Sequence, residues 1–378
     1  MKNKNFLNRD IRVISIVFAA LFIAVAVYLG IFLANDAQSV INNPYNRRTE
    51  DYKKKVVRGD ILSEDGDVLA FTHVNEDGST VRVYPYGREF AHVVGFEANG
   101  GLGIESKYNY TLLKPGVGFF KNISNEINGE KSPGISVKTT LDPDLQEECI
   151  KALKGISGGV IVIEPETGHI MALCSAPDFD PSTIEDDWES IISGDKGGIL
   201  FNRVTQGAIL PSQLDIGGIV LDCDIFTKEN VFSAIDTKEG DGFATILQYA
   251  DVFCAIANDG YLMNNMLVSG YIDAAGKTSK TFAPSRSDRL YTTAECEEYL
   301  KVLKGNVDLC DGYEAFAVKG ECPANDPEAA YEYEHSYFAC FAQKGDEKIV
   351  VCVMIENKQE SKTEAVEVGK EILDYYFR

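Results

Sequence analysis

Two short stretches hold residue types that could carry out nucleophilic chemistry. In the first, Ser212 lies three residues before Asp215, and in the second, Lys319 lies three residues before Cys322. A serine needs a neighbouring base to remove its proton, and a thiol is activated by a nearby positive charge. Each stretch therefore offers a nucleophile for acyl transfer that works only if a suitable partner meets it in space.

The residues ahead of Ser212 predict a structural support for this chemistry. Residues 158–164 and 169–175 are apolar runs rich in β-branched side chains, and the Pro-Glu-Thr-Gly segment at 165–168 separates them. Two such runs around a tight turn are typical of a hairpin of mostly buried strands. Residues 202–207 (Asn-Arg-Val-Thr-Gln-Gly) then lead toward Ser212.

Apolar periodicity and capping residues predict the elements around this hairpin. Asp142-Pro143 begins one helix, Thr292 to Glu295 form a capping box for a second, and Ser361 to Glu364 cap the last one. The predicted helices are 143–154, 244–258, 292–303 and 362–377, and the predicted strands are 137–140, 262–268, 335–343 and 348–356. Strands flanked by helices at both ends of this region indicate a sheet covered on both faces.

The N-terminus has the pattern of a membrane anchor. Residues 1–12 carry Lys2, Lys4, Arg9 and Arg12 against Asp10, and residues 13–34 are uncharged and apolar. Twenty-two helical residues extend about 33 Å, which spans a bilayer. The positive flank places the N-terminus in the cytoplasm and the rest outside. A cleaved signal peptide is the alternative, although no A-x-A-like cleavage site follows the apolar run.

Composition narrows the function classes. The 378 residues carry a net charge of −22, which disfavours nucleic acid as a partner because phosphate would be repelled. The nine cysteines include no C-x-x-C pair, and one or two disulfides are possible. Four cysteines lie in apolar runs: Cys174, Cys254, Cys340 and Cys352. The other five lie in more polar stretches of sequence: Cys149, Cys223, Cys296, Cys310 and Cys322. We expect no metal or cofactor. The acidic cluster at 185–189 is typical of a solvated helix start, and His92 is expected to have a structural role.

Motifs after the apolar segment resemble a known family. Residues 58–62 (Arg-Gly-Asp-Ile-Leu), 84–87 (Tyr-Pro-Tyr-Gly) and 102–105 (Leu-Gly-Ile-Glu) follow one another, with Asp65-Gly66 as a predicted hairpin turn. This order is similar to the extracytoplasmic pedestal of class B penicillin-binding proteins, in the clostridial and actinobacterial branch that pairs with SEDS-type glycan polymerases. Arg-Gly-Asp also invites an adhesion interpretation, but the longer pattern explains it better.

The hairpin and the residues after it resemble the start of the transpeptidase domain of the same family. The resemblance implies an α+β fold with an antiparallel five-stranded sheet flanked by helices, in which the hairpin joins the two C-terminal strands. The helices at 143–154 and 362–377 would pack on one face of this sheet. The implied domains are a cytoplasmic tail (1–12), a transmembrane anchor (13–34), a β-rich pedestal (35–135) and a transpeptidase-like domain (136–378).

The family's three catalytic motifs are degenerate in this sequence. A serine at a helix N-terminus needs a lysine one turn later, but one alignment places Gln213 and Ile216 there and a shift of one places Ser212 and Asp215. No Ser-x-Asn occurs between 217 and 243, so the helical lid that carries it is reduced. The third motif, Lys-Thr-Gly, has become Lys319-Gly320-Glu321, where Glu321 would repel a substrate carboxylate.

The sequence therefore predicts a catalytically inactive, membrane-anchored homologue that acts as a scaffold or regulator in peptidoglycan synthesis. Its expected partners are a SEDS-type glycan polymerase or other wall-synthesis proteins, the membrane and peptidoglycan itself. Two alternatives stay open. One is an active D,D-transpeptidase with displaced residues, using Ser212 with Lys319 as base or Cys322 as nucleophile. The other is an extracellular binding protein with no role in the wall.

Overall fold

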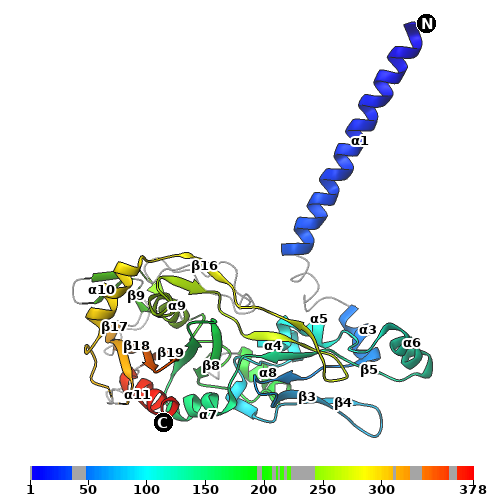
Figure 1. The fold of residues 1–378 in the computed structure, drawn as a ribbon. Coiled ribbons are helices and arrows are strands. Elements are labelled where there is room, and N and C mark those ends of the chain that lie inside the picture. Colours follow the sequence, from blue (N-terminus) through cyan, green and yellow to red (C-terminus); the bar gives the residue numbers. More distant parts are fainter. Residues whose placement is uncertain are drawn as a thin grey trace. The chain divides into compact units, whose positions relative to one another are not determined.

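The computed structural model (Figure 1) describes most of the chain. The described residues are 2–35, 48–193, 198–206, 210–211, 213–216, 219–222, 243–309, 312–323, 334–356 and 364–378. The contacts divide the chain into two compact units, Met1–Asp51 and Tyr52–Arg378.

The first unit is dominated by helix α1 (Lys2–Asn35). Its segment Ile11–Phe32 is 22 residues long, apolar and without burial against other parts of the chain. At about 1.5 Å per residue this segment is long enough to cross the hydrocarbon core of a bilayer. The predicted apolar helix is therefore confirmed. A signal sequence near an N-terminus passes the same test of length and composition.

The centre of the second unit is a five-stranded sheet. Its order is β17-β18-β19-β7-β8, and each neighbouring pair is antiparallel. The strands are β7 (Gly158–Glu164), β8 (His169–Ala176), β17 (Glu314–Pro323), β18 (Glu334–Lys344) and β19 (Glu347–Ile355). The predicted hairpin is thus confirmed, and β7 pairs with β19 as expected for strands that lie far apart in sequence.

Helices cover both faces of this sheet (Figure 1). On one face, Val160 and Val162 share a core with α7 (Pro143–Ala152) and α11 (Ala365–Tyr376). On the other face, Ile161 and Ile163 share a core with α9 (Ile246–Ala257). Because successive strand residues point to opposite faces, one continuous apolar run serves both layers. The predicted packing of the 143–154 and 362–377 helices on one face is confirmed.

The predicted strand at 262–268 is wrong, because the chain forms two strands there. They are β13 (Tyr261–Met263) and β14 (Val268–Ile272), which belong to different sheets. Between them, the Met266 amide donates to the Gly168 carbonyl at 2.7 Å, and the Ile170 amide donates to the Met266 carbonyl at 3.0 Å. These bonds to the hairpin replace the ladder bonds that would continue the strand.

The two predicted capping boxes have different outcomes. Thr292 and Glu295 form the predicted box at the start of α10 (Thr293–Leu303). The box predicted at Ser361 to Glu364 is wrong, because α11 begins at Ala365 with Glu364 as its N-cap and without a side-chain cap bond. The Ala365 amide instead donates to the hydroxyl of Ser336, on strand β18, at 3.0 Å. Ser361 lies outside the described residues.

A second, six-stranded sheet joins segments from both sides of position 135. Its order is β15-β14-β6-β2-β3-β4, with β2 (Ile61–Leu62), β3 (Val68–Val74), β4 (Thr80–Val83), β6 (Ser136–Thr139) and β15 (Thr278–Thr281). Ile61 is paired with Ala70 in antiparallel register, which confirms the hairpin turn predicted at Asp65-Gly66. Ile61 also pairs with Val137 in parallel register.

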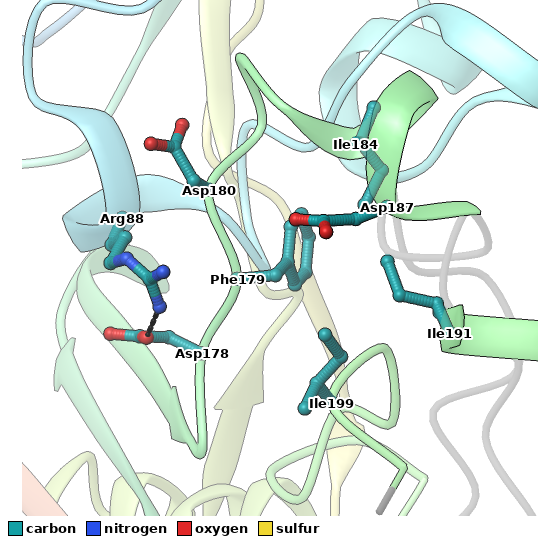
Figure 2. A pocket seen from close by; sticks show the side chains of 8 residues that line it. All are labelled: Arg88, Asp178, Phe179, Asp180, Ile184, Asp187, Ile191 and Ile199. Carbon is teal, nitrogen blue, oxygen red and sulfur yellow. Dashed lines mark hydrogen bonds and ion pairs between the residues drawn. The ribbon is translucent and has the colours of Figure 1, made fainter. Parts of the chain in front are cut away.

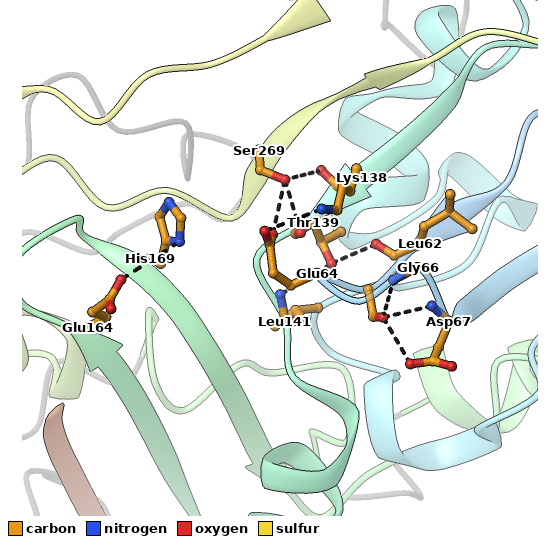
Figure 3. Close-up of polar contacts among 11 residues, drawn as sticks. Leu62, Glu64, Gly66, Asp67, Lys138, Thr139, Leu141, Glu164, His169 and Ser269 are labelled. Atoms are coloured by element: carbon orange, nitrogen blue, oxygen red, sulfur yellow. Dashed lines mark hydrogen bonds and ion pairs between the residues drawn. The ribbon is translucent and has the colours of Figure 1, made fainter. Parts of the chain in front are cut away.

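Side-chain contacts connect β2 and the turn after it to β6 and β14 of this sheet (Figure 3). The Thr139 hydroxyl donates to the Leu62 carbonyl at 2.8 Å, and the Ser269 hydroxyl donates to the Glu64 carboxylate at 3.2 Å. The same carboxylate lies 3.3 Å from Lys138 Nζ. One acidic side chain from the turn after β2 therefore contacts both β6 and β14, which lie about 70 and 200 residues away in sequence.

The remaining elements are short. The helices are α3 (Arg48–Lys55), η1 (Gly87–Phe90), η2 (Ala98–Gly100), α4 (Gly103–Lys107), α5 (Asn109–Leu112), α6 (Phe119–Asn128) and α8 (Ile184–Ile192). The strands are β1 (Val56–Val57), β5 (Ser132–Pro133), β9 (Leu210–Pro211), β10 (Gln213–Ile216), β11 (Ile219–Asp222), β12 (Phe243–Ala244) and β16 (Arg286–Arg289).

Six cysteines in the described part of the chain have buried side chains and form no disulfide. They are Cys149, Cys174, Cys254, Cys296, Cys340 and Cys352. Cys149 and Cys296 have polar neighbours in the sequence, but both side chains are buried because each lies on the inward face of its helix. Burial raises the pKa of Cys174, Cys254 and Cys340 above the ordinary thiol value, so these thiols stay protonated and unreactive.

The pedestal motifs meet in a buried ion cluster. Glu105 is fully buried, and its carboxylate accepts hydrogen bonds from Arg58 Nε and Arg82 Nε, both at 2.7 Å. Burial by itself would raise the pKa of Glu105, but Arg58 and Arg82 outweigh it and hold that pKa below its ordinary value. Arg58 is therefore unavailable to an adhesion receptor, and Arg-Gly-Asp here serves the fold.

We expect Glu105→Gln to destabilise the protein strongly. The variant leaves two arginines buried beside a neutral amide, and breaking a buried pair in this way costs about 3–5 kcal/mol. Urea unfolding of the full-length protein in detergent, followed by circular dichroism, measures the change. Glu147→Gln is the control, because Glu147 pairs with Lys151 on the exposed face of α7 and should leave the free energy of unfolding nearly unchanged. Equal effects of the two variants would refute a structural role for the cluster.

Candidate functional site

A compact turn at residues 202–206 lies directly ahead of the first catalytic motif position. The Asn202 amide donates to Gln206 Oε1 at 3.0 Å, and the Gln206 amide donates back to the Asn202 carbonyl at 2.8 Å. The Val204 amide donates to Asn202 Oδ1 at 3.0 Å. Asn202 therefore acts as the internal brace of the turn, which explains an asparagine at this place.

This turn is fixed to the hairpin and to α9. The Arg203 amide donates to the Ser175 hydroxyl of β8 at 3.0 Å, and Arg203 Nε lies 2.9 Å from the Glu356 carboxylate. The Leu247 amide at the start of α9 donates to the Val204 carbonyl at 3.2 Å. We call β7, β8, α9 and residues 202–206 the hairpin frame. Hydrogen bonds, the Arg203–Glu356 ion pair and burial hold these segments together.

The described positions of the first motif lie on a strand and not on a helix. Residues Gln213–Ile216, which include the motif positions Asp215 and Ile216, form strand β10, paired antiparallel with β11. Ser212 lies outside the described residues. A serine and a lysine three positions apart share one face of a helix, but a strand does not provide this arrangement. In the interval expected to hold the second motif, the structure describes β11 and residue Phe243 of β12.

The third motif lies on the edge strand β17. Lys319 Nζ lies 3.2 Å from the carboxylate of Glu364, the N-cap residue of α11, and both side chains are about half exposed. Gly320 is paired with Tyr337, and a Cβ atom at Gly320 would lie 2.3 Å from the Tyr337 hydroxyl oxygen. The tyrosine ring thus occupies the space beside this position. Glu321 is exposed, and Cys322 continues the strand.

A pocket of about 330 Å³ lies elsewhere, beside α8 (Figure 2). Arg88 from η1 and Asp178 from the loop after β8 form an ion pair at 2.9 Å on one side of it. The described lining residues are Arg88, Asp178, Phe179, Asp180, Ile184, Asp187, Ile191 and Ile199. This described lining holds carboxylates, a guanidinium and apolar groups but no serine, cysteine or lysine. The described lining of the pocket therefore offers no nucleophile for acyl transfer.

The sequence did not predict the pairing at this pocket. Arg88 and Asp178 are 90 positions apart, and neither belongs to a local pattern that predicts contact. Asp187 belongs to the predicted acidic helix start and lines the pocket. Among the described residues, no group of three or more histidine, cysteine, aspartate or glutamate side chains is arranged to hold a metal.

His92 has the structural role that the sequence predicts. Its ring is buried against Phe179 at 5.1 Å between centroids, and Nε2 lies 2.8 Å from the Ile199 carbonyl. Burial lowers the pKa of His92 to about 4, so the ring is neutral at physiological pH. A neutral imidazole can donate one hydrogen bond to this carbonyl, which secures the segment after α8.

Asp251, on α9, is a buried carboxylic acid outside the motif positions. It is fully buried, and its Oδ1 accepts from Asn265 Nδ2 at 2.7 Å. Burial raises the pKa of Asp251 to about 7, against the smaller effect of the Asn265 bond. Asp251 Oδ2 and Asn265 Oδ1 have no hydrogen-bond partner among the described residues. When Asp251 is protonated, its Oδ2–H can donate to Asn265 Oδ1, which satisfies both atoms. Asp251 lines no described pocket, so we assign it a structural role.

This acid gives the fold a defined pH dependence. The pKa of Asp251 is near 3.8 in the unfolded chain and about 7 in the fold, so the folded state holds its proton longer. The contribution of Asp251 to the free energy of unfolding is fully present below about pH 4. It is lost as the pH rises through 7, at up to about 1.4 kcal/mol per pH unit. Urea unfolding across this range should show a falling free energy.

Asp251→Asn should flatten this fall, because an amide has no proton to lose. The matched control is Glu297→Gln, an exposed carboxylate on α10 that should leave the profile as it is. Parallel profiles for the wild type and Asp251→Asn would contradict the assignment.

Comparison with known proteins connects this geometry to one family. A family model described as the penicillin binding protein A dimerisation domain matches residues 58–137. Peptidoglycan D,D-transpeptidase PbpA of Mycolicibacterium smegmatis is 27% identical over 218 residues, which is 52% of this chain and 43% of that protein. Peptidoglycan D,D-transpeptidase MrdA of Escherichia coli is 28% identical over 179 residues, or 38% of this chain and 28% of the relative.

Solved structures share the fold across most of the chain. The D,D-transpeptidase domain of a peptidoglycan glycosyltransferase from Eggerthella lenta has a TM-score of 0.68 at 22% identity, covering 84% of this chain and 97% of that one. Penicillin-binding protein A from M. tuberculosis, as an imipenem acyl-enzyme complex, has a TM-score of 0.70 at 17% identity, covering 87% and 100%. At these identities the likeness shows the fold.

The match in sequence is confined to part of the relatives, since the chain spans less than half the length of the curated proteins it resembles. The dimerisation domain, the homologous transpeptidases and the shared fold agree with one another, and with the motifs at Arg58 and Glu105. By these findings, residues 58–137 match the dimerisation domain of penicillin binding protein A, the chain resembles peptidoglycan D,D-transpeptidases in sequence, and it has the fold of penicillin-binding-protein transpeptidase domains.

Proposed function

We propose that this chain is a catalytically inactive, membrane-anchored penicillin-binding-protein homologue that acts as a scaffold or regulator of a cell-wall polymerase. The observation that carries the proposal is the contrast between an ordered hairpin frame and a first motif that forms strand β10. A fold that keeps its support but lacks a nucleophile–base pair is suited to binding rather than to turnover.

The residues at the motif positions support this proposal chemically. A serine hydroxyl reacts only with a base within hydrogen-bond reach. Ile216 cannot be that base, and a carboxylate such as Asp215, with a reference pKa of about 3.9, is a weak acceptor for a hydroxyl proton near neutral pH. In the alternative of an active enzyme, Lys319 would have to leave Glu364, its ion-pair partner at 3.2 Å, to serve Ser212 or to activate Cys322.

We expect no covalent adduct when the purified full-length protein is incubated with penicillin G. Intact-mass spectrometry measures the adduct directly. Penicillin-binding protein A from M. tuberculosis serves as the positive control, because one of its solved structures is a penicillin G acyl-enzyme complex. A stoichiometric adduct that Ser212→Ala abolishes would overturn the inactive assignment, and an adduct on Cys322 would support the thiol alternative.

The double variant Gln213→Ser, Ile216→Lys is a matched extension of this experiment. It restores the residue types of the serine–lysine pair in the first alignment, but it does not restore a helix or the Ser-x-Asn segment. It should therefore remain unacylated. Acylation of the double variant would mean that only the side chains, and not the backbone, had lost the activity.

The proposed partner is a polytopic SEDS-type glycan polymerase. The extracytoplasmic part would begin after residue 34, with residues 35–135 as the pedestal and 136–378 as the transpeptidase-like domain, and the N-terminus in the cytoplasm. The dimerisation-domain match at 58–137 and the apolar helix α1 support docking through these two parts. Peptidoglycan itself is a second candidate ligand, because homologues are named for reactions on it.

Purification of the full-length chain from its host in mild detergent should recover such a polymerase. Replacing residues 1–34 by an unrelated membrane-spanning helix should weaken the recovery while the chain stays in the membrane. Recovery of no wall-synthesis protein by either form would favour the extracellular binding protein, for which the pocket beside α8 is the candidate ligand site.

A further inference from the structure

Helix α6 exposes its apolar side chains and buries a polar one, which is the opposite of an ordinary surface helix. Its apolar side chains are exposed, with 71% of Phe119, 86% of Phe120, 38% of Ile123 and 79% of Ile127 accessible to solvent. Its buried side chain is the polar Asn125. A helix on a globular protein normally packs its apolar stripe inward, whereas none of the described residues covers this stripe.

The two faces of α6 are geometrically separate. At 100° per residue, Phe119, Phe120, Ile123 and Ile127 fall within an arc of about 100°, and Asn122 and Asn125 fall on the opposite side. The polar side is fixed to strand β5. Asn125 Nδ2 donates to the Ser132 hydroxyl at 3.0 Å, and that hydroxyl donates to Asn122 Oδ1 at 2.9 Å. The helix is therefore held by its polar face, and its apolar face points away from the body.

Chain connectivity keeps α6 within reach of the membrane. Glu126 of α6 forms an ion pair with Lys55, the last residue of α3. Twelve residues lie between Asn35, where α1 ends, and Arg48, where α3 begins. Thirteen peptide steps extend about 45 Å at most. If α1 spans the bilayer, the start of α3 therefore lies no more than about 45 Å from the lipid surface at which α1 ends.

The chemistry around α6 suits a lipid interface. Phenylalanine and isoleucine side chains enter the boundary between headgroups and acyl chains, while lysines beside them contact phosphate. Lys53, Lys54 and Lys55 end α3, the helix paired with α6 through Lys55 and Glu126, while Lys121 lies on the side of α6 away from the apolar arc. This run of positive charge stands out in a chain whose net charge is −22. The same net charge disfavours a second copy of the chain as the cover.

We propose that the apolar face of α6 (Phe119, Phe120, Ile123 and Ile127) lies in the interface of the membrane that α1 spans. The inference rests on the proposed membrane anchoring and adds a second point of attachment. Two attachments would fix the tilt of the extracytoplasmic body relative to the bilayer, whereas the anchor alone fixes only its distance.

Depth-dependent fluorescence quenching tests this proposal on the full-length chain. Trp188, the single tryptophan, is replaced by phenylalanine, and Phe120→Trp then reports on the apolar face. The protein is reconstituted into vesicles of equal parts phosphatidylglycerol and phosphatidylcholine with brominated acyl chains. Asn128→Trp in the same background is the matched control, because position 128 is exposed and lies outside the apolar arc.

We expect the Phe120→Trp variant to lose most of its emission in brominated vesicles and to resist quenching by aqueous iodide, while the Asn128→Trp variant behaves in the opposite way. Flotation of the vesicles reports the anchor separately. A chain that floats while the indole of the Phe120→Trp variant stays open to iodide refutes the α6 proposal and leaves the anchor intact. Protection from iodide without quenching by bromine means a protein cover and also refutes it. Failure to float refutes the anchor and the α6 proposal together.

Discussion

The fold of residues 58–105 depends on one buried carboxylate. Glu105 collects Arg58 and Arg82 from segments 47 and 23 positions earlier, and Arg82 also donates to the Gly59 carbonyl at 2.9 Å. The desolvation of a carboxylate is recovered only when charged donors surround it. This requirement fixes where β4 lies relative to the segment before β2. It also explains why the Arg-Gly and Gly-Ile-Glu motifs occur together, because each supplies the partner of the other.

The elements with a strong local pattern could be predicted from the sequence. The hairpin at 158–175 was predictable because its β-branched runs suit a sheet buried on both faces, and Thr292 to Glu295 were predictable because a capping box is local. The elements that failed depend on distant residues. The break after Met263 depends on bonds to Gly168 and Ile170, and the start of α11 depends on Ser336 of β18. A local pattern cannot contain such partners.

The candidate site was predictable in its residues but not in its geometry. The sequence shows that no lysine follows Ser212 at the required distance, but it does not show that residues 213–216 form a strand. Nor does it show that Lys319 pairs with Glu364, or that Arg88 meets Asp178 beside α8. Helix α6 is a further case, because an apolar stripe by itself predicts burial against the body, while Asn122 and Asn125 bind the opposite side to Ser132.

The six-stranded sheet has a mechanical consequence. Strand β6 is bonded to β2 on one side and to β14 on the other, so segments from both sides of position 135 share a continuous ladder of hydrogen bonds. A hinge there would have to break backbone hydrogen bonds and the contacts of Glu64. A force that rotates β2–β4 is therefore carried through β6 to β14 by backbone hydrogen bonds, and not through a flexible connection.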